Sequence, residues 1–243
     1  MPWPHIPLSP DPAAFPARPP TDLRDPAVIT AHDQAAFDAV ETMVDHWDRP
    51  GWTARTRSYY WMLTFPDSPA LADLARRCQR HLAPLGLDPV PADGLHITLT
   101  RVGPAGALPP GLLDDVITAA LPLLPTAFRL RAVPLAGSRG AVRLTVAPWL
   151  PVLALHAALG EAMTSRDLTP QKPTALFRPH LSLAYNNRPR LAAPVIESVT
   201  ALRDLPPVDL HVREVQLVEL RREGRSYRWE VVKSLPLDGL PRS

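Results

Sequence analysis

The sequence predicts an α+β protein built from two similar lobes, whose sheets face each other across a central cleft. Short apolar and aromatic runs typical of strands alternate with longer runs that have helical periodicity. The resulting β-α-β-α-β order occurs twice between about residues 57 and 236. In both halves the second strand begins at a histidine, which is followed by an apolar residue and then by a hydroxyl residue. This weak internal repeat predicts two lobes with approximate twofold symmetry.

The first lobe is expected at about residues 57–137. Its strands are predicted in "SYYWMLTF", "GLHITLTRV" and "AFRLRAVPL". The helix in "SPALADLARRCQRHLAPLG" has Pro69 in its first turn and Gly86 beyond its end, both favoured positions for these residues. A second helix is predicted in "PGLLDDVITAALPLL".

The second lobe is expected at about residues 138–236 and repeats this order. Its strands are predicted in "GAVRLTVAPW", "PHLSLAYNN" and "VDLHVREVQLVEL", with helices in "LPVLALHAALGEAMTSR" and "PVIESVTALRDL". "SYRWEVVKSLPL" is predicted to form a hairpin with the last strand across "RREGR", and residues 237–243 are left as a tail.

The N-terminal region has a different character. Residues 1–26 contain nine prolines and predict an extended, Pro-rich arm. Residues 27–56 are expected to form a helical extension, because Phe37, Val40, Val44 and Trp47 fall on one helical face after a capping threonine, Thr30. "DRPG" is predicted to end this helix, which would cover an edge strand or gate the cleft.

Composition narrows the functional classes. Apolar residues make up 46% and charged residues 21% of the 243 residues, which is typical of a globular protein. The single cysteine excludes an intrachain disulfide and a cysteine-rich metal cluster. No signal-peptide pattern and no run of roughly 18 apolar residues is present, so we expect a soluble, cytoplasmic protein with no membrane contact.

The two histidine motifs carry the strongest functional signal. Because side chains alternate along a strand, "HITL" places His96 and Thr98 on one face, and "HLSL" does the same for His180 and Ser182. The simplest alternative is that both histidines are polar-face residues bonded to a neighbour. A metal site is less well supported, because two histidines without a third ligand are too few for a usual zinc site.

Phosphodiester cleavage uses such a set of groups. One neutral imidazole takes a proton from the nucleophile, and a protonated one gives a proton to the leaving oxygen. Hydroxyl groups can donate to the phosphoryl oxygens as charge develops.

On the motifs "HITL" and "HLSL" and the bilobal layout of about residues 57–236, the chain resembles the two-histidine (2H) phosphoesterase superfamily. Within it, the chain is most similar to 2′-5′ RNA ligase-like proteins and 2′,3′-cyclic phosphodiesterases. The resemblance implies that His96 and His180 are the acid–base pair and that Thr98 and Ser182 bind phosphate. It implies no cofactor and no metal, and leaves open which histidine is the base.

Five further residues are candidate substrate contacts. Arg101 and Tyr185 each lie five residues after a motif histidine, near strand ends where a bulge can re-aim a side chain. Tyr59, Trp61 and Tyr227 could stack a nucleobase, and packing within the sheet is the alternative for all three.

These observations predict a metal-independent phosphodiesterase acting on 2′,3′-cyclic phosphate ends or on related cyclic or 2′-5′-linked nucleotides or RNA. The expected partner is therefore a nucleotide or an RNA end, without an obligate protein partner. Two alternatives stay open: a nucleotide- or RNA-binding module that lost turnover, and a 2′-5′ RNA ligase working in the reverse direction.

Overall fold

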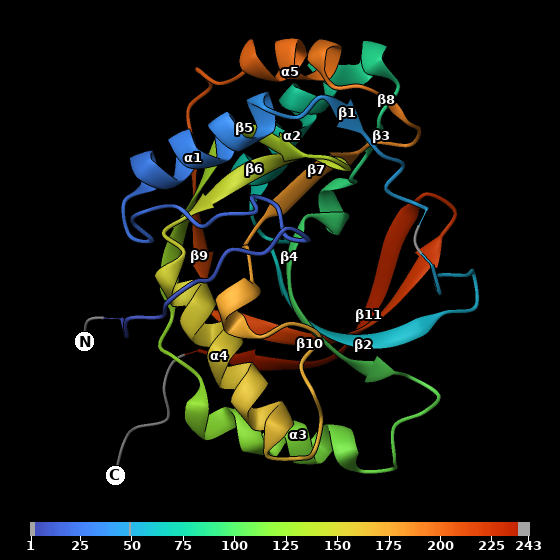
Figure 1. Ribbon diagram of the computed structural model, residues 1–243. Helices are drawn as coiled ribbons and strands as arrows, with labels where there is room; N and C mark the ends of the chain where they lie inside the picture. Colours follow the sequence, from blue (N-terminus) through green and yellow to red (C-terminus); the bar gives the residue numbers. More distant parts are fainter. Residues whose placement is uncertain (1–2, 49, 238–243) are drawn as a thin grey trace.

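The structure, a computed structural model, describes residues 3–48 and 50–237, so the expected tail lies outside the described residues apart from Leu237. Helices and antiparallel strands are mixed in two lobes, which confirms the predicted α+β class (Figure 1). The helices are α1 (Pro26–Asp38), α2 (Pro69–Leu82), α3 (Leu112–Ala120), α4 (Leu150–Thr164) and α5 (Ala193–Thr200). The strands are β1 (Thr42–Met43), β2 (Arg57–Thr64), β3 (Asp88–Pro89), β4 (His96–Pro104), β5 (Phe128–Ser138), β6 (Ala141–Ala147), β7 (Leu181–Tyr185), β8 (Arg190–Leu191), β9 (Val208–Val212), β10 (Glu214–Glu223) and β11 (Ser226–Pro236).

Two antiparallel sheets form the framework of the described chain. One has the strand order β11-β10-β2-β4, and the other has the order β3-β7-β6-β5-β9. A short pair, β1 with β8, joins the N-terminal region to the loop after β7. The four-stranded sheet curls around one side of the molecule, and the five-stranded sheet lies across the other (Figure 1).

The two halves of the chain exchange strands between these sheets. Strand β5, expected to complete the lobe at 57–137, pairs with β6 and β9 in the five-stranded sheet. Strands β10 and β11, expected in the lobe at 138–236, continue the four-stranded sheet beside β2. Each sheet therefore contains strands from both halves, and the chain crosses between them.

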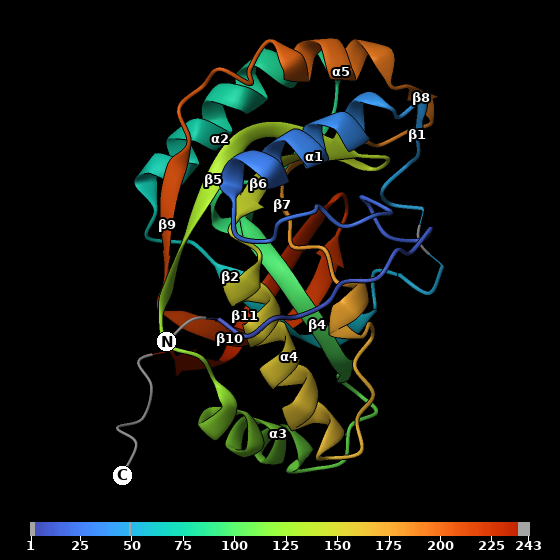
Figure 2. The same ribbon diagram turned by 60° about the vertical axis from the view of Figure 1, so that its left-hand side comes forward.

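Helices are exchanged in the same way. Helix α2 follows β2 of the four-stranded sheet but packs on β7 and β9 of the other sheet, together with α5. Helix α4 follows β6 of the five-stranded sheet but packs on β4, together with α3. Figures 1 and 2 show α2 and α5 at one end of the molecule and α3 and α4 at the other. The expected symmetry is thus present, with each half covering the sheet of the other.

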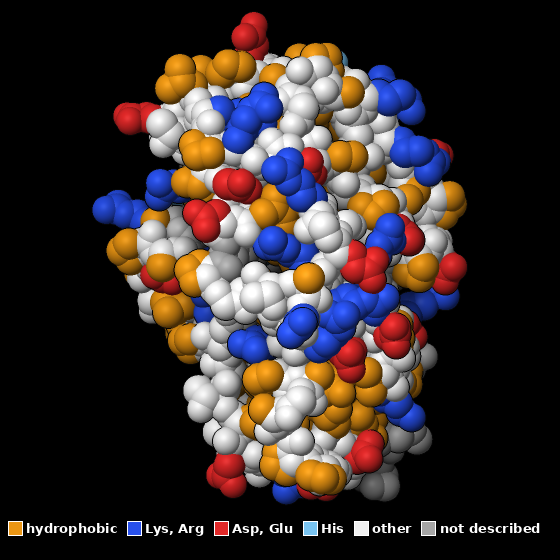
Figure 3. Space-filling view, turned by 90° about the vertical axis from the view of Figure 1, so that its right-hand side faces the viewer, with side chains coloured by type: hydrophobic (Ala, Val, Ile, Leu, Met, Phe, Trp, Pro, Cys, Tyr) orange, Lys and Arg blue, Asp and Glu red, His pale blue; other side chains and the backbone are white. Residues whose placement is uncertain are grey.

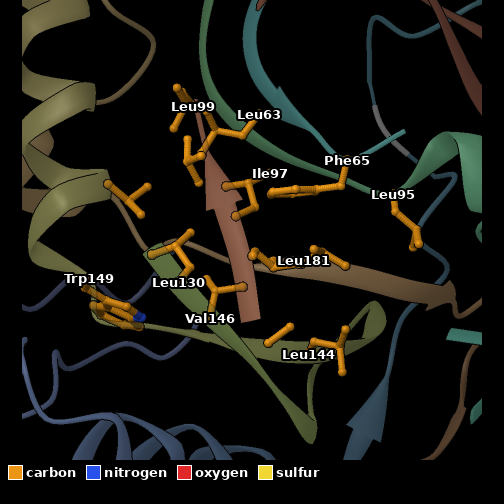
Figure 4. Packing of buried hydrophobic residues seen from close by; sticks show 14 of the residues in the cluster. Leu63, Phe65, Leu95, Ile97, Leu99, Leu130, Leu144, Val146, Trp149 and Leu181 are labelled. Atoms are coloured by element: carbon orange, nitrogen blue, oxygen red, sulfur yellow. The ribbon is translucent and has the colours of Figure 1, made fainter. Parts of the chain in front are cut away.

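One continuous core holds both sheets together. Ile97 from β4 and Leu63 from β2 point toward Leu130 and Leu181 of the five-stranded sheet (Figure 4). All four side chains are at most 1% exposed. Burying an apolar side chain of this size contributes roughly 1.5–3 kcal/mol. The apolar faces of β4 and β7 are therefore fixed in this core, which constrains where the alternating polar residues can point.

The expected helix at residues 30–47 is wrong in its extent. Helix α1 begins after Asp25, whose side chain accepts a hydrogen bond from the Ala27 N–H, so Asp25 and not Thr30 is the N-cap. The helix ends at Asp38, and the chain then pairs with β8 through β1. Tertiary pairing therefore overrides the helical periodicity that continues beyond residue 38 in the sequence.

The expected single strand "VDLHVREVQLVEL" is divided in the structure. Its first part is β9, at the edge of the five-stranded sheet, and its second part is β10, in the four-stranded sheet. Only Arg213 separates the two strands. The chain crosses here between the lobes, which an uninterrupted strand pattern in the sequence conceals.

Candidate active site

A cavity of about 610 Å³ lies between the polar faces of the two sheets. His96 and Thr98 line it from β4, and His180 and Ser182 line it from the start of β7. Both predicted motifs therefore face one space. Strands β4 and β7 also contact each other directly, which holds the two motifs together.

Strand alternation explains why these four residues face the cavity. Ile97 lies between His96 and Thr98, and Leu181 lies between His180 and Ser182. Both apolar side chains are completely buried in the core. Because neighbouring side chains on a strand point to opposite faces, burying the apolar residues turns the histidine and the hydroxyl residue toward the cavity.

The two imidazoles have the same local hydrogen bond. Nδ1 of His96 lies 2.7 Å from the carbonyl oxygen of Gly94, and Nδ1 of His180 lies 2.9 Å from that of Arg178. In each case the partner is two residues before the histidine. A carbonyl oxygen only accepts, so each Nδ1 must carry the hydrogen. In a neutral ring this leaves the lone pair on Nε2, where it can accept a proton.

His96 sits in a partly desolvated position. Its ring and that of Trp229 pack in a T-shaped arrangement with centroids 5.3 Å apart. Burial lowers the pKa of His96 below its usual value of 6.5, and the hydrogen bond with the Gly94 carbonyl opposes this shift only in part. The neutral form of His96 is therefore favoured near neutral pH.

His180 is supported through Arg178, whose side chain is only 5% exposed. Its guanidinium donates to the carbonyl of Ser9 at 2.6 Å and to that of Pro16 at 3.2 Å. It also donates to the carbonyls of Ala175 and Phe177. Arg178 thus fixes the N-terminal arm against the segment that carries His180.

The N-terminal arm forms part of the cavity wall. Its residues 12–15 line the cavity beside the segment that precedes His180. Besides its bonds with Arg178, the arm donates from the Ser9 N–H to the Ala175 carbonyl at 2.9 Å. The Pro-rich segment is therefore ordered by docking on the body, as its composition requires of an arm without a core of its own.

Arg143 is a cavity residue that the sequence analysis did not single out. It lies on β6 directly opposite Ser182 of β7, and residues opposite each other in an antiparallel pair share a face. Its guanidinium also reaches the carbonyl of Phe15 at 3.5 Å and interacts electrostatically with Asp33. Burial raises the pKa of Asp33 to about 6, while the Thr145 hydroxyl and Arg143 oppose this rise. The signal in the sequence was an arginine inside the apolar strand "GAVRLTVAPW".

The five candidate substrate contacts fall into two groups. Tyr185 and Tyr227 line the cavity, whereas Tyr59, Trp61 and Arg101 are not among its lining residues. Trp61 is completely buried and Tyr59 packs on the same large core, so packing is the structural role of both. The cavity-facing residue of this strand is Tyr60, which lies between them.

Register shifts in β7 and β4 explain where Tyr185 and Arg101 point. Opposite β6, Ala184 pairs with Val142 and Ser182 pairs with Arg143, so Leu183 is an extra residue in β7. Opposite β2, Leu99 and Val102 are the corresponding extra residues in β4, one on each side of Thr100 and Arg101. Such bulges break the strict alternation, as the sequence analysis anticipated. Arg101 consequently pairs with Tyr60, but its guanidinium donates to the Ser58 hydroxyl at 2.9 Å, beyond the lining of the cavity.

Basic side chains gather across the middle of the face that Figure 3 presents. Within the cavity, the cationic lining residues that the structure describes are Arg139, Arg143, Lys172 and Arg178. This concentration of positive charge favours an anionic ligand. No group of three histidine, cysteine, aspartate or glutamate side chains that could hold a metal ion occurs within residues 3–48 and 50–237.

The sequence profile of the 2′-5′ RNA ligase superfamily matches residues 65–224, which include both histidine motifs. The chain belongs to the 2′-5′ RNA ligase superfamily. This membership confirms the predicted relation to the 2H phosphoesterases. A comparison with curated protein sequences finds no significant match.

Several solved structures have a fold similar to that of this superfamily member. Apo LigT of E. coli is 18% identical, with a TM-score of 0.56, over 74% of this chain and 97% of LigT. TT0787 of Thermus thermophilus is also 18% identical, with a TM-score of 0.54, over 75% of this chain and 98% of that protein. A structure described only as a phosphoesterase has 18% identity and a TM-score of 0.54, over 75% and 99% of the two chains. These likenesses show the fold.

No helix in the described part of this superfamily member is long and apolar enough to cross a membrane.

Proposed function

We propose that the protein is a phosphodiesterase that hydrolyses 2′,3′-cyclic phosphate or a related cyclic or 2′-5′-linked nucleotide or RNA end, and that it needs no metal. The observation that carries this proposal is the pair of matched imidazoles in one cavity. Each has Nδ1 bonded to a carbonyl two residues earlier, and each has a hydroxyl residue one strand pleat away. Two proton-transfer groups and two hydroxyl donors around one space suit in-line displacement at phosphorus.

The proposed reaction balances with water as the only co-reactant. Nε2 of the neutral histidine takes a proton from water as its oxygen attacks phosphorus. The bond from phosphorus to the leaving ribose oxygen breaks, and the protonated histidine gives its proton to that oxygen. The product is a phosphomonoester, and the two histidines have exchanged protonation states. Burial favours the neutral form of His96 and therefore suits it to the base role for substrates bound in the matching orientation.

In this mechanism the hydroxyls of Thr98 and Ser182 and the guanidinium of Arg143 stabilise the negative charge that develops on the phosphoryl oxygens. Arg143 lies opposite Ser182 on the neighbouring strand, so both side chains start from the same part of the cavity wall. A guanidinium matches the geometry of two phosphoryl oxygens better than an ammonium does. Donors placed where charge develops are the largest contribution in many enzymes of this kind.

A nucleotide as the substrate is supported by the fold relatives. E. coli LigT structures have been solved with 3′-AMP and with ATP, at TM-scores of 0.54 and 0.52 to this chain. The cationic and aromatic lining of the cavity fits a ligand that combines phosphate with a planar base. A cytoplasmic location remains a prediction.

Two other functions stay in competition. A binding module that had lost turnover would retain the cavity, and a ligase would run the same proton transfers in reverse. Retention of both histidines and both hydroxyl residues on one cavity favours a working enzyme over a binding module.

The test is turnover of a substrate panel in EDTA. The panel contains 2′,3′-cyclic nucleotides, 2′-5′ dinucleotides and RNA with a cyclic phosphate end. We expect hydrolysis by the wild type and a loss of roughly 10²–10⁴-fold in kcat for His96→Ala and for His180→Ala. His81→Ala, at an exposed position on α2 outside the cavity, is the matched control. Activity that disappears in EDTA would refute the metal-free mechanism, and tight binding without turnover would identify a binding module.

A further inference from the structure

The N-terminal region contributes more to the cavity than the family relationship implies. The family profile begins at residue 65, and about a quarter of this chain has no equivalent in LigT, which is itself matched almost completely. Yet residues of the segment 44–52 line the cavity beside the histidine motifs. These residues lie before the first residue that the family profile matches.

Backbone hydrogen bonds hold Val44 and His46 in place. The N–H of Val44 donates to the Arg139 carbonyl at 2.8 Å, and the N–H of His46 donates to the Asn186 carbonyl at 2.8 Å. The buried Asn186 side chain donates in turn to the Val44 carbonyl at 2.8 Å. These bonds attach Val44 and His46 to the turn between β5 and β6 and to the end of β7, so this part of the cavity wall is held in place.

His46 is the centre of an aromatic surface in the cavity. Its ring stacks on Tyr185 with centroids 3.9 Å apart and planes 20° from parallel. Its Nε2 lies 3.0 Å from the Tyr227 hydroxyl. Trp52 continues this surface, with ring centroids 5.8 Å from Tyr227 and 6.5 Å from Tyr60. All five rings line the cavity.

The cationic and the acidic residues that line the cavity come from different parts of the chain. The described cations come from residues 139–178, near the histidine motifs, whereas the described carboxylates, Asp45 and Asp48, both come from the segment 44–52. Carboxylates repel phosphate, but they accept hydrogen bonds from the N–H groups of nucleobases. The acidic and aromatic side therefore suits a base, and the cationic side suits a phosphate.

We propose that residues 44–48 and Trp52 form a nucleobase-binding wall, with His46 and Trp52 as its stacking residues. This inference rests on the proposed function for the position of the phosphate. It narrows the substrate class to nucleotides whose base binds beside the reacting phosphate. A sugar phosphate that binds through its phosphate alone would not belong to this class. Stacking on an aromatic side chain tolerates every base. The wall should therefore bind a nucleotide with any base, and it should bind a ligand that has no base more weakly.

Binding of 3′-AMP, compared with methyl ribofuranoside 3-phosphate, tests the wall by calorimetry. The second ligand keeps the sugar and phosphate and replaces the base by a methyl group. We expect His46→Ala and Trp52→Ala each to raise the Kd of 3′-AMP by roughly tenfold and to leave the Kd of the base-free ligand unchanged. His46→Phe, which keeps a planar ring, should retain most of the affinity, and His81→Ala should retain all of it.

The outcomes separate this inference from the proposed function. Wild-type protein that binds both ligands equally, or fails to bind 3′-AMP, overturns the wall even if it hydrolyses cyclic nucleotides. Equal weakening of both ligands in His46→Ala also overturns it, because the segment would then only support the cavity. Base-dependent binding in a protein that turns over nothing on the substrate panel sustains the wall and refutes the phosphodiesterase.

Discussion

The two histidines have the same immediate geometry but different support. His96 and His180 both bond through Nδ1 to a carbonyl two residues earlier. For His96 that carbonyl belongs to Gly94, at the end of a short 3-10 turn inside the family's own region. For His180 it belongs to Arg178, whose guanidinium is bonded to Ser9 and Pro16 of the N-terminal arm.

This difference separates the two halves by their contact with the N-terminal region. Two similar strands carry the reacting groups, but only the His180 side is bonded to the N-terminal arm, whereas His96 packs against Trp229 of β11. The same half also carries the aromatic surface at Tyr185 on which His46 stacks. We therefore expect the His180 side to respond to changes in the N-terminal region and the His96 side to be insensitive to them.

Removing the two hydroxyls tests the equivalence of the halves and has the largest expected effect among these comparisons. Thr98→Val and Ser182→Ala should each lower kcat/KM on a 2′,3′-cyclic nucleotide by roughly 10²–10³-fold, because each removes a donor to the transition-state charge. The loss should fall mainly on kcat, since the interaction strengthens as charge develops. Thr200→Val, at an exposed position on α5, is the control. A large loss in one variant and none in the other would show that only one half binds the reacting phosphate.

Replacing Arg178 tests the dependence of the His180 side on the arm. Arg178→Met removes every donor to the carbonyls of Ser9, Pro16, Ala175 and Phe177 while keeping a similar length. Burial lowers the pKa of Arg178, which reports a desolvation cost that offsets part of these bonds. We therefore expect a loss of about 2 kcal/mol in the free energy of unfolding rather than the sum of four bonds.

Urea unfolding and hydrogen exchange measure this effect separately. Exchange should increase in residues 9–17 and around His180, but not around His96. Arg129→Met, at an exposed position on β5, serves as the control. Unchanged exchange in the arm, or an equal increase beside both histidines, would contradict the difference in support.

Local patterns in the sequence were sufficient for the parts of the site that depend on strand alternation. The order of apolar and polar residues placed His96 and Thr98 on one face because Ile97 had to be buried, and the same reasoning applied to "HLSL". The hairpin across "RREGR" followed from Gly224, whose φ of 58° suits a glycine in a tight turn. These features need only short-range information.

Features that depend on long-range pairing could not be read in the same way. The strands that could pair with β5 and β10 all have similar sequence patterns, so the sequence does not indicate which sheet each of them joins. The helical periodicity through Val44 and Trp47 gave no sign that hydrogen bonds with Arg139 and Asn186 would draw this segment into the cavity wall. The bulge at Leu99 likewise decides where Arg101 points, and a bulge leaves little trace in a single sequence.

The smallest expected effect concerns pH and distinguishes the roles of the two histidines. Burial lowers the pKa of His96, so its neutral form persists as the pH falls below 6.5. If His96 is the base, the acidic limb of kcat/KM lies below pH 6.5. Trp229→Ala removes the ring against His96 and rehydrates it, so its pKa should rise and move the acidic limb upward. At pH 6 this shift lowers activity by less than about tenfold, because one pKa unit corresponds to one tenfold change in the protonation ratio.

The alkaline limb, which reports the His180 side, should stay in place. Movement of the alkaline limb instead would assign His96 as the acid, and a profile that does not move at all would show that Trp229 does not cause the low pKa.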